Sequence, residues 1–257
     1  MMPPIVIIGI GELGGVFAKA FLRSGYPVYP VTRETSMIEA ADYLPNPQLV
    51  LVAVAENDFH PVMQAIPDRW RGRLGLLQNE LLPRDWEEHD IANPTVISVW
   101  FEKKKGMDYR VLLPSPVYGP NAQVVAGSLA KIEIPCKILA DEDELVFKLV
   151  LKNVFVFTIN IAGLVLAEGT TTSALWQTHP KLALDVAENV IDLQEHATGR
   201  TFSHERLKKG LLAGIKGDPV HKCRGRSAWE RLARAVKLAD DAGLKVQTIR
   251  DIQRKSS

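Results

Sequence analysis

The chain has 257 residues, of which 46% are hydrophobic and 24% are charged, and its formal net charge is +1. This composition is typical of a soluble globular protein with one large domain or two modest ones. The near-zero charge excludes a chain-wide electrostatic attraction, so we expect neither a nucleic-acid partner nor a membrane. Cys136 and Cys223 lie far apart without metal-ligand spacing, and the six histidines show no paired spacing. The sequence therefore predicts neither a disulfide framework nor a metal site.

Two apolar segments bear on localisation. The N-terminal apolar run is interrupted at Gly9 and Glu12, so we expect no signal peptide and a cytoplasmic protein. The apolar stretch 154–167 contains polar residues and is shorter than the roughly 20 apolar residues that span a bilayer. We interpret it as part of a buried helix.

The first half of the chain alternates between strand and helix patterns. Apolar, β-branched runs predict strands at 5–8, 28–31, 49–55, 74–77, 95–100, 109–113 and near 131–138, and helical spacing predicts helices at 13–24 and 58–66. The KKKG segment ending at Gly106 predicts a hairpin, and 114–120 (PSPVYGP) predicts a turn-rich connection. Strands separated by helices imply a mostly parallel sheet.

The second half has helix signals. Asp141 with Glu144 and Ser227 with Glu230 have capping-box spacing, and the second pair starts a helix that stops at Gly243. A further helix starts at Pro180 and ends before Gly199.

The segment GIGELG places Gly9, Gly11 and Gly14 directly after the first strand and at the opening of a helix. The first glycine permits a tight turn, the second lets the backbone approach a pyrophosphate, and the third lets helix and strand pack closely. Exposed N–H groups at the helix start, including those of Glu12 and Leu13, favour an anionic group. The motif predicts a pyridine dinucleotide site.

The residues after the second strand bear on the choice of dinucleotide. An acidic residue there binds the ribose 2′-hydroxyl of NAD, whereas a cation binds the 2′-phosphate of NADP. The chain has Thr32 and Arg33, followed by Glu34. We predict NADP(H) as the cofactor, the alternative being that Arg33 is a solvated charge and Glu34 contacts the ribose.

Together these signals predict an α/β fold with two domains. An N-terminal Rossmann dinucleotide-binding domain would occupy residues 1–140, and an all-helical C-terminal domain for substrate binding and dimerisation would occupy residues 141–257.

Several short segments of the chain together resemble the motifs of a known protein family. They are GIGELG (9–14), TR (32–33), QN (78–79), YGP (118–120), ELVFKL (144–149) and GRSAWERLARAVKLADDAG (225–243). In this layout the sequence resembles the ketopantoate reductases, within the wider group that has a 6-phosphogluconate-dehydrogenase-like C-terminal domain.

The resemblance implies hydride transfer from NADPH to the carbonyl of a 2-oxo acid, in a cleft between the domains. A lysine in the first helix of the second domain would be the general acid, and here either Lys148 or Lys152 matches it. Asn79 matches an asparagine that holds nicotinamide and substrate, and Glu80 stands where the family usually has glycine. Asn153 and Asn160, seven residues apart on the same helix, complete a polar cluster for the substrate.

A basic segment follows, with ten lysines and arginines between Arg206 and Lys237. It has three interpretations: a solvated helical surface, a pocket in which His221 and Arg224 grip an anionic substrate or cofactor phosphate, or a nucleic-acid contact, which the scarcity of aromatic residues disfavours.

We therefore expect an NADPH-dependent oxidoreductase acting on a small anionic carbonyl or imine compound. Two alternatives stay open, a non-catalytic NADP-binding sensor or scaffold and an opine- or hydroxy-acid-type dehydrogenase. A homodimer also stays open.

Overall fold

The computed structural model describes residues 2–256. The chain forms two compact units, Met1–Lys148 and Leu149–Ser257, and each is described by itself. The division falls inside the helix α7 (Glu142–Gly163). The boundary predicted from the sequence, between residues 140 and 141, lies at the start of this helix.

The first unit is built on a seven-stranded sheet with the order β2-β1-β3-β4-β5-β8-β9. Strands β2 to β5 run parallel, β8 is antiparallel to β5, and β9 is parallel to β8. The strands are β1 (Ile5–Ile8), β2 (Val28–Val31), β3 (Leu49–Val52), β4 (Leu74–Leu76), β5 (Thr95–Ile97), β8 (Ser115–Tyr118) and β9 (Cys136–Ile138). The predicted α/β fold with a mostly parallel sheet is confirmed.

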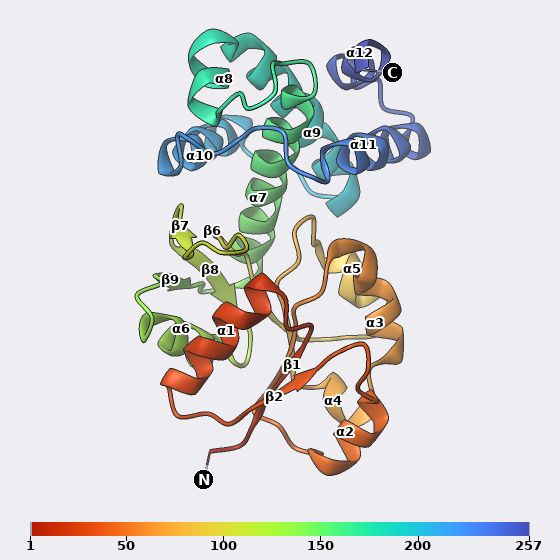
Figure 1. The fold of residues 1–257 in the computed structure, drawn as a ribbon. Coiled ribbons are helices and arrows are strands. Elements are labelled where there is room, and N and C mark those ends of the chain that lie inside the picture. The colour runs from red at the N-terminus through yellow and green to blue at the C-terminus, as the bar shows by residue number, and fades with distance from the viewer. Residues whose placement is uncertain (1, 257) are drawn as a thin grey trace. The chain divides into compact units, whose positions relative to one another are not determined.

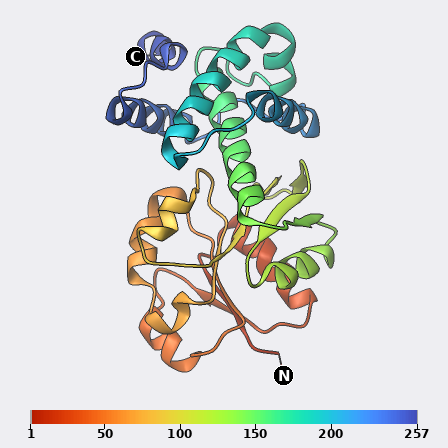
Figure 2. The same ribbon diagram turned by 180° about the vertical axis from the view of Figure 1, so that it is seen from behind.

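Helices cover both faces of this sheet (Figures 1 and 2). They are α1 (Glu12–Arg23), α2 (Met37–Tyr43), the 3-10 turn η1 (Glu56–Asp58), α3 (Phe59–Ala65), α4 (Asp68–Arg71), α5 (Pro83–Glu87) and α6 (Ala122–Ala130). Helices α1 and α6 pack together on one face, and α2 to α5 lie on the other. Strands β1 and β3 are apolar and fully buried because helices cover them on both sides.

Two strands of the sheet contain proline, and the sequence predicted one of them correctly. Pro30, which lacks an N–H, lies in β2, and β2 is an edge strand as expected. The prediction of a mere connection at 114–120 was wrong, since this segment contains β8. Pro116 lies in β8, and its carbonyl oxygen accepts from the Ser98 N–H at 2.9 Å.

The predicted hairpin around Gly106 exists but uses shorter strands. Phe101–Glu102 (β6) pairs with Arg110–Val111 (β7) in a separate two-stranded ribbon, whereas 95–97 belongs to the main sheet. The predicted strand 95–100 ends early because the Trp100 N–H donates to the Ser115 hydroxyl (2.9 Å).

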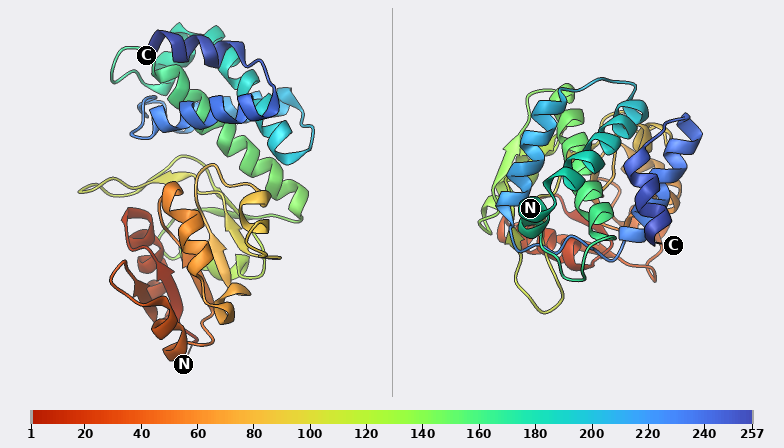
Figure 3. Two further views of the ribbon diagram at one scale, coloured as in Figure 1. Left: turned by 90° about the vertical axis from the view of Figure 1, so that its right-hand side faces the viewer. Right: turned by 90° about the horizontal axis from the view of Figure 1, so that it is seen from above.

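The second unit is helical, as predicted. Its elements are the C-terminal part of α7, α8 (Thr172–Thr178), α9 (Pro180–Thr198), α10 (His204–Gly217), α11 (Ala228–Ala242) and α12 (Gln247–Ser256). Helix α12 packs on α9 and α11, as the right-hand view in Figure 3 shows. Within residues 2–256, α7 alone is long and apolar enough to cross a membrane, but 89% of its apolar window is buried in the protein, as for a core helix.

Helix ends test the capping predictions. Asp141 Oδ1 accepts from the Glu144 N–H at 2.8 Å, as predicted for the start of α7. Gly199 and Gly243 end α9 and α11 in the left-handed conformation. The predicted capping box of Ser227 and Glu230 was wrong. Among the described residues, Ser227 makes no side-chain cap bond, because its backbone (ψ 17°) lies outside the extended region that capping requires.

Candidate dinucleotide-binding site

The predicted cofactor residues meet at the carboxyl edge of the parallel sheet. Ile8 is in register with Val31 on one side and with Val52 on the other, and Val52 is in register with Leu76. The segments that leave these strands therefore start at one edge. The chain passes from β1 through α1 to β2 and then to β3 on the far side of β1, so the order of strands reverses there. Open α/β sheets bind ligands at such a point.

The three motif glycines have three different environments. Gly9 has φ +90°, and a Cβ on it would lie 2.7 Å from the Ala53 carbonyl oxygen. A Cβ on Gly14 would lie 2.1 Å from the Gly9 carbonyl oxygen, so α1 and the β1 turn touch backbone to backbone. A Cβ on Gly11 would meet no atom of residues 2–256 within 4 Å apart from its chain neighbours. Gly9 and Gly14 thus shape the turn, and Gly11 leaves space beside the start of α1.

The N-terminus of α1 opens onto this space. No side chain within residues 2–256 caps the helix at Gly11, so the first-turn N–H groups of Glu12 and Leu13 remain available to an anion. An open cradle beside uncapped helix N–H groups is the arrangement that a pyrophosphate requires. The residues present therefore fit a dinucleotide.

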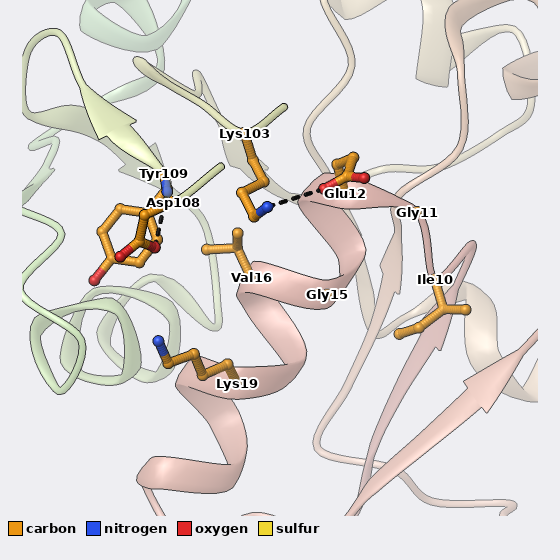
Figure 4. Close-up of a pocket in the computed structure, with 9 residues that line it drawn as sticks. All are labelled: Ile10, Gly11, Glu12, Gly15, Val16, Lys19, Lys103, Asp108 and Tyr109. Atoms are coloured by element: carbon orange, nitrogen blue, oxygen red, sulfur yellow. Dashed lines mark hydrogen bonds and ion pairs between the residues drawn. The ribbon is translucent and has the colours of Figure 1, made fainter. Parts of the chain in front are cut away.

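A cavity of about 360 Å³ lies along the first turns of α1. Its wall includes Ile10, Gly11, Lys19 and, from the segment around the β6–β7 ribbon, Lys103 and Tyr109 (Figure 4). Lys103 Nζ is 3.2 Å from Glu12 Oε2. This ion pair places a cation beside the one acidic residue in the first turn of α1 and offsets its repulsion of a bound phosphate. Lys103 is not among the residues predicted from the sequence, because 91 positions separate it from Glu12.

Thr32 and Arg33 lie directly after β2, as predicted. The Thr32 hydroxyl accepts from the Glu34 N–H at 3.3 Å, and the Thr32 N–H donates to the Thr35 hydroxyl at 3.1 Å, which fixes the turn. The Arg33 guanidinium donates to Asp58 Oδ2 at 3.2 Å, and its side chain is 92% exposed. Arg33 is thus accessible to a ligand phosphate, which would have to compete with Asp58.

Asn79 follows β4 and is also held by η1. Its Nδ2 donates to Glu56 Oε1 at 3.0 Å. The two carboxylates of η1, Glu56 and Asp58, therefore contact Asn79 and Arg33, which are both predicted cofactor residues. Glu80 has φ +66°, a left-handed conformation that costs a non-glycine residue about 1 kcal/mol or more. The backbone shape that glycine would favour is therefore kept although the residue has changed.

The asparagines of α7 make buried bonds within the helical unit. Asn153 Nδ2 donates to Gln194 Oε1 at 2.8 Å, and Asn160 Oδ1 accepts from the Arg231 guanidinium at 2.9 Å. A Cβ on Gly225 would lie 2.9 Å from Asn160 Oδ1. Asn160 is thus packed against the loop before α11, whereas Asn153 faces α9.

Lys148 and Lys152 lie one helical turn apart on α7. Both side chains are half-buried, and each ammonium lies 5.8 Å from the centre of a neighbouring phenylalanine ring, Phe147 and Phe155 respectively. The structure gives both lysines comparable surroundings, so it does not choose between them.

His221 and Arg224 belong to the loop between α10 and α11. The His221 carbonyl accepts from the Thr172 N–H at 2.8 Å, and the Arg224 guanidinium lies 5.5 Å from the centre of the Trp229 ring. Cys223 lies between two basic residues, Lys222 and Arg224, and burial raises the pKa of its thiol to about 11.

At least three of the ten basic residues of this segment pair with nearby carboxylates. Lys208 contacts Glu188, Arg234 lies 3.9 Å from Glu230, and Lys237 lies 2.7 Å from Asp241. Burial alone would raise the pKa of the Glu188 carboxyl, but the bonds from Lys208 and His204 outweigh it and lower the pKa. These pairs agree with a solvated helical surface for that part of the segment.

The chain is similar to known proteins in structure but not detectably in sequence. No protein-family model and no curated protein sequence matches the chain. Among solved structures, 2-dehydropantoate 2-reductase from Methylococcus capsulatus matches with a TM-score of 0.69 and 12% identity, over 97% of this chain and 94% of that one. Dimeric ketopantoate reductase from Staphylococcus aureus matches with a TM-score of 0.66 and 14% identity, over 97% and 96%.

A complex of D-mandelate dehydrogenase with NADH has a TM-score of 0.66 and 12% identity, over 98% of this chain and 96% of that one. The fold is therefore that of a two-part dehydrogenase or reductase with a Rossmann-type sheet and a helical C-terminal region. More particularly, the resemblance to ketopantoate reductases is confirmed for the fold over nearly the full chain.

Proposed function

We propose that this protein is an oxidoreductase that binds NADPH and reduces the carbonyl or imine of a small anionic compound, such as a 2-oxo acid. The observation that carries the proposal is the open space at Gly11 beside the uncapped start of α1, at the point where the strand order reverses. The fold supports it, since similar structures include ketopantoate reductases and an NADH complex of D-mandelate dehydrogenase.

The residues of the sheet edge bind the cofactor in this proposal. The N–H groups of Gly11, Glu12 and Leu13 bind the pyrophosphate, and Gly9 and Gly14 keep the turn in shape. Arg33 binds the 2′-phosphate, next to the turn formed by Thr32. The bound nicotinamide supplies the hydride, and Asn79 holds the carboxamide or the substrate in place.

Helix α7 and the helical unit supply the remaining groups in this proposal. Lys148 or Lys152 donates a proton to the substrate oxygen as the carbonyl carbon is reduced, and its positive charge also favours an anionic substrate. Asn160, together with Asn153, His221 and Arg224, is the proposed substrate contact. The Arg231 bond to the Asn160 carbonyl oxygen leaves the Asn160 NH₂ group to donate to a substrate carboxylate.

A second candidate is a hydroxy-acid dehydrogenase that uses NAD⁺ and works in the oxidative direction. Two observations favour it: solved complexes of D-mandelate dehydrogenase with NADH share the fold, and Asp58 pairs with the arginine that a 2′-phosphate needs. An opine-type dehydrogenase and a non-catalytic sensor are outcomes of the same tests.

We also propose a cytoplasmic protein. A homodimer would agree with the dimeric state of the Staphylococcus aureus structure, and light scattering on the purified chain measures it.

The test is NADPH oxidation, followed at 340 nm with a panel of 2-oxo acids, and NAD(P)⁺ reduction with the matching 2-hydroxy acids. We expect turnover with at least one 2-oxo acid and a loss of kcat of about a hundredfold or more in either Lys148→Ala or Lys152→Ala, as for a general acid. Lys181→Ala, an exposed lysine on α9, is the matched control and should retain full activity.

Two results would contradict the reductase. Turnover only in the oxidative direction with NAD⁺ would favour the hydroxy-acid dehydrogenase. NADPH binding without turnover in either direction would favour the sensor.

A further inference from the structure

Two histidines and a glutamate, far apart in the sequence, come together on the α3–α5 side of the first unit. His60 lies in the first turn of α3, Glu88 directly follows α5, and His89 is the next residue. His60 Nδ1 is 2.6 Å from Glu88 Oε1 and 3.0 Å from His89 Nε2, and His89 Nε2 is 3.4 Å from Glu88 Oε1. Three atoms that can each donate a lone pair to a metal ion thus lie within 4.8 Å of one another.

We infer that His60, Glu88 and His89 form a binding site for a divalent transition-metal ion, with Zn²⁺ as the best fit. Two imidazole nitrogens and one carboxylate oxygen are a ligand set that zinc accepts, with water in the fourth position. Zinc bonds of about 2.0–2.1 Å in tetrahedral geometry place ligand atoms roughly 3.3 Å apart. The observed separations bracket this value within less than 1 Å.

The surroundings hold the ligands in place. The His89 side chain is only 9% exposed, whereas those of His60 and Glu88 are 45% and 55% exposed. The Phe59 ring stands edge-on to both imidazoles, with ring centres 5.2 Å from His60 and 6.4 Å from His89. One ligand is therefore fixed in the core, and the other two leave an open side through which an ion and water enter.

Charge also favours a cation at this point. His60 Nδ1 and His89 Nε2 lie 3.0 Å apart, within hydrogen-bond distance, and an imidazole nitrogen that accepts a hydrogen bond does so through the lone pair that also binds a metal. The Glu88 carboxylate lies beside both rings and is an acceptor-only group. A divalent ion can interact favourably with all three groups.

The site is separate from the proposed dinucleotide site but adjoins it in sequence. His60 is two residues beyond Asp58, which pairs with Arg33, and four beyond Glu56, which pairs with Asn79. The inference does not depend on the proposed enzyme activity.

The experiment titrates ZnCl₂ into the full-length, untagged, EDTA-dialysed protein by calorimetry. A parallel titration with Co²⁺ follows the visible absorption bands that report tetrahedral nitrogen and oxygen ligation. We expect one ion per chain and a loss of affinity of about a hundredfold or more in His60→Gln and Glu88→Gln, because each removes a ligand. Both positions are half-exposed, so the variants should fold, which circular dichroism and thermal melting verify.

His204→Gln is the matched control. His204 lies with Asp192 and Glu195 in the helical unit, where a second group of ligand atoms gathers, but it is already paired with Glu188 at 2.7 Å. We expect His204→Gln to bind Zn²⁺ as the unchanged protein does. Absence of saturable binding, or binding that His60→Gln leaves unchanged, would overturn the inference.

Discussion

At the scale of single residues, the turn η1 connects the polar groups of the candidate site. Its two carboxylates, Glu56 and Asp58, contact Asn79 and Arg33, which follow two different strands. Both contacts join residues more than twenty positions apart in the chain. They hold Asn79 and Arg33 near the carboxyl edge, and the Asp58 charge sets how strongly Arg33 responds to a phosphate.

The pair Arg33 and Asp58 allows a matched test of cofactor preference. Arg33→Ala should weaken NADPH binding by about tenfold while leaving NADH binding unchanged, because only NADPH carries the 2′-phosphate. Asp58→Asn should strengthen NADPH binding, since it removes the competing carboxylate. Fluorescence titration with both nucleotides measures the four affinities. Equal effects of Arg33→Ala on NADH and NADPH would contradict the assignment.

Single site residues could be predicted from the sequence only where a local sequence pattern marks them. The glycine spacing identified Gly9, Gly11 and Gly14 because each role follows from its position relative to one strand and one helix. The contacts of Lys103 with Glu12 and of His60 with His89 depend on how distant segments fold together. No spacing pattern reports such contacts, so the basic wall of the cavity and the histidine cluster were not foreseen.

At the scale of elements, α7 combines an apolar surface with two buried asparagines. Asn153 and Asn160 are 2% and 4% exposed, and each is satisfied by a partner from another segment, Gln194 of α9 or Arg231 of α11. Buried amides of this kind fix how helices pack, because any other register leaves them without hydrogen bonds.

The Asn153–Gln194 pair tests this packing role. Asn153→Ala leaves the Gln194 amide buried without its partner, so we expect a loss of about 1–3 kcal/mol in the free energy of unfolding. The double variant Asn153→Leu with Gln194→Leu should recover most of it, because both polar groups are removed. Urea denaturation measures the three values. If Asn153→Ala keeps its stability, the packing role is wrong, and a raised KM would then assign Asn153 to substrate contact alone.

Helices and strands were predicted correctly where local sequence signals determine them. The predictions were wrong where tertiary contacts determine the secondary structure. The strands β1, β2, β3 and β4 and the ends of α9 and α11 follow from apolar runs and from Pro180, Gly199 and Gly243. Strand β8 was missed because prolines and a glycine flank it, a composition typical of turns. It forms because β5 and β9 pair with it on both sides.

At the scale of the whole molecule, each compact unit carries one cysteine. Cys136 belongs to the first unit and Cys223 to the second. Burial raises the pKa of the Cys136 thiol to about 12 and that of Cys223 to about 11. Both pKa values lie above the usual 8.5 of a free thiol, so each folded unit keeps its cysteine in the unreactive protonated form at neutral pH.

Thiol labelling therefore reports the opening of the second unit through the buried Cys223, and the raised pKa of the partly exposed Cys136 in the first unit. At pH 8 the thiolate fraction of either cysteine is on the order of one in a thousand or less, and labelling with Ellman's reagent should be far slower than for a free thiol. The rate should rise with pH, because the pH approaches the raised pKa values from below. Cys136→Ser and Cys223→Ser let each unit be followed alone, and both cysteines should react at once in denaturant. Fast labelling of either folded variant at pH 7 would contradict the burial.

The binding of a pyridine dinucleotide at the start of α1 is measured most directly by calorimetric titration of NADPH and NADH into the unchanged protein and into Gly11→Val. We expect saturable binding to the unchanged protein and to the control Gly127→Ala, whose added methyl also meets open space. Gly11→Val should keep its melting temperature but lose at least about tenfold in affinity, because its side chain fills the space that a pyrophosphate needs. If neither nucleotide binds, or if Gly11→Val binds as well as the unchanged protein, the proposed site is wrong.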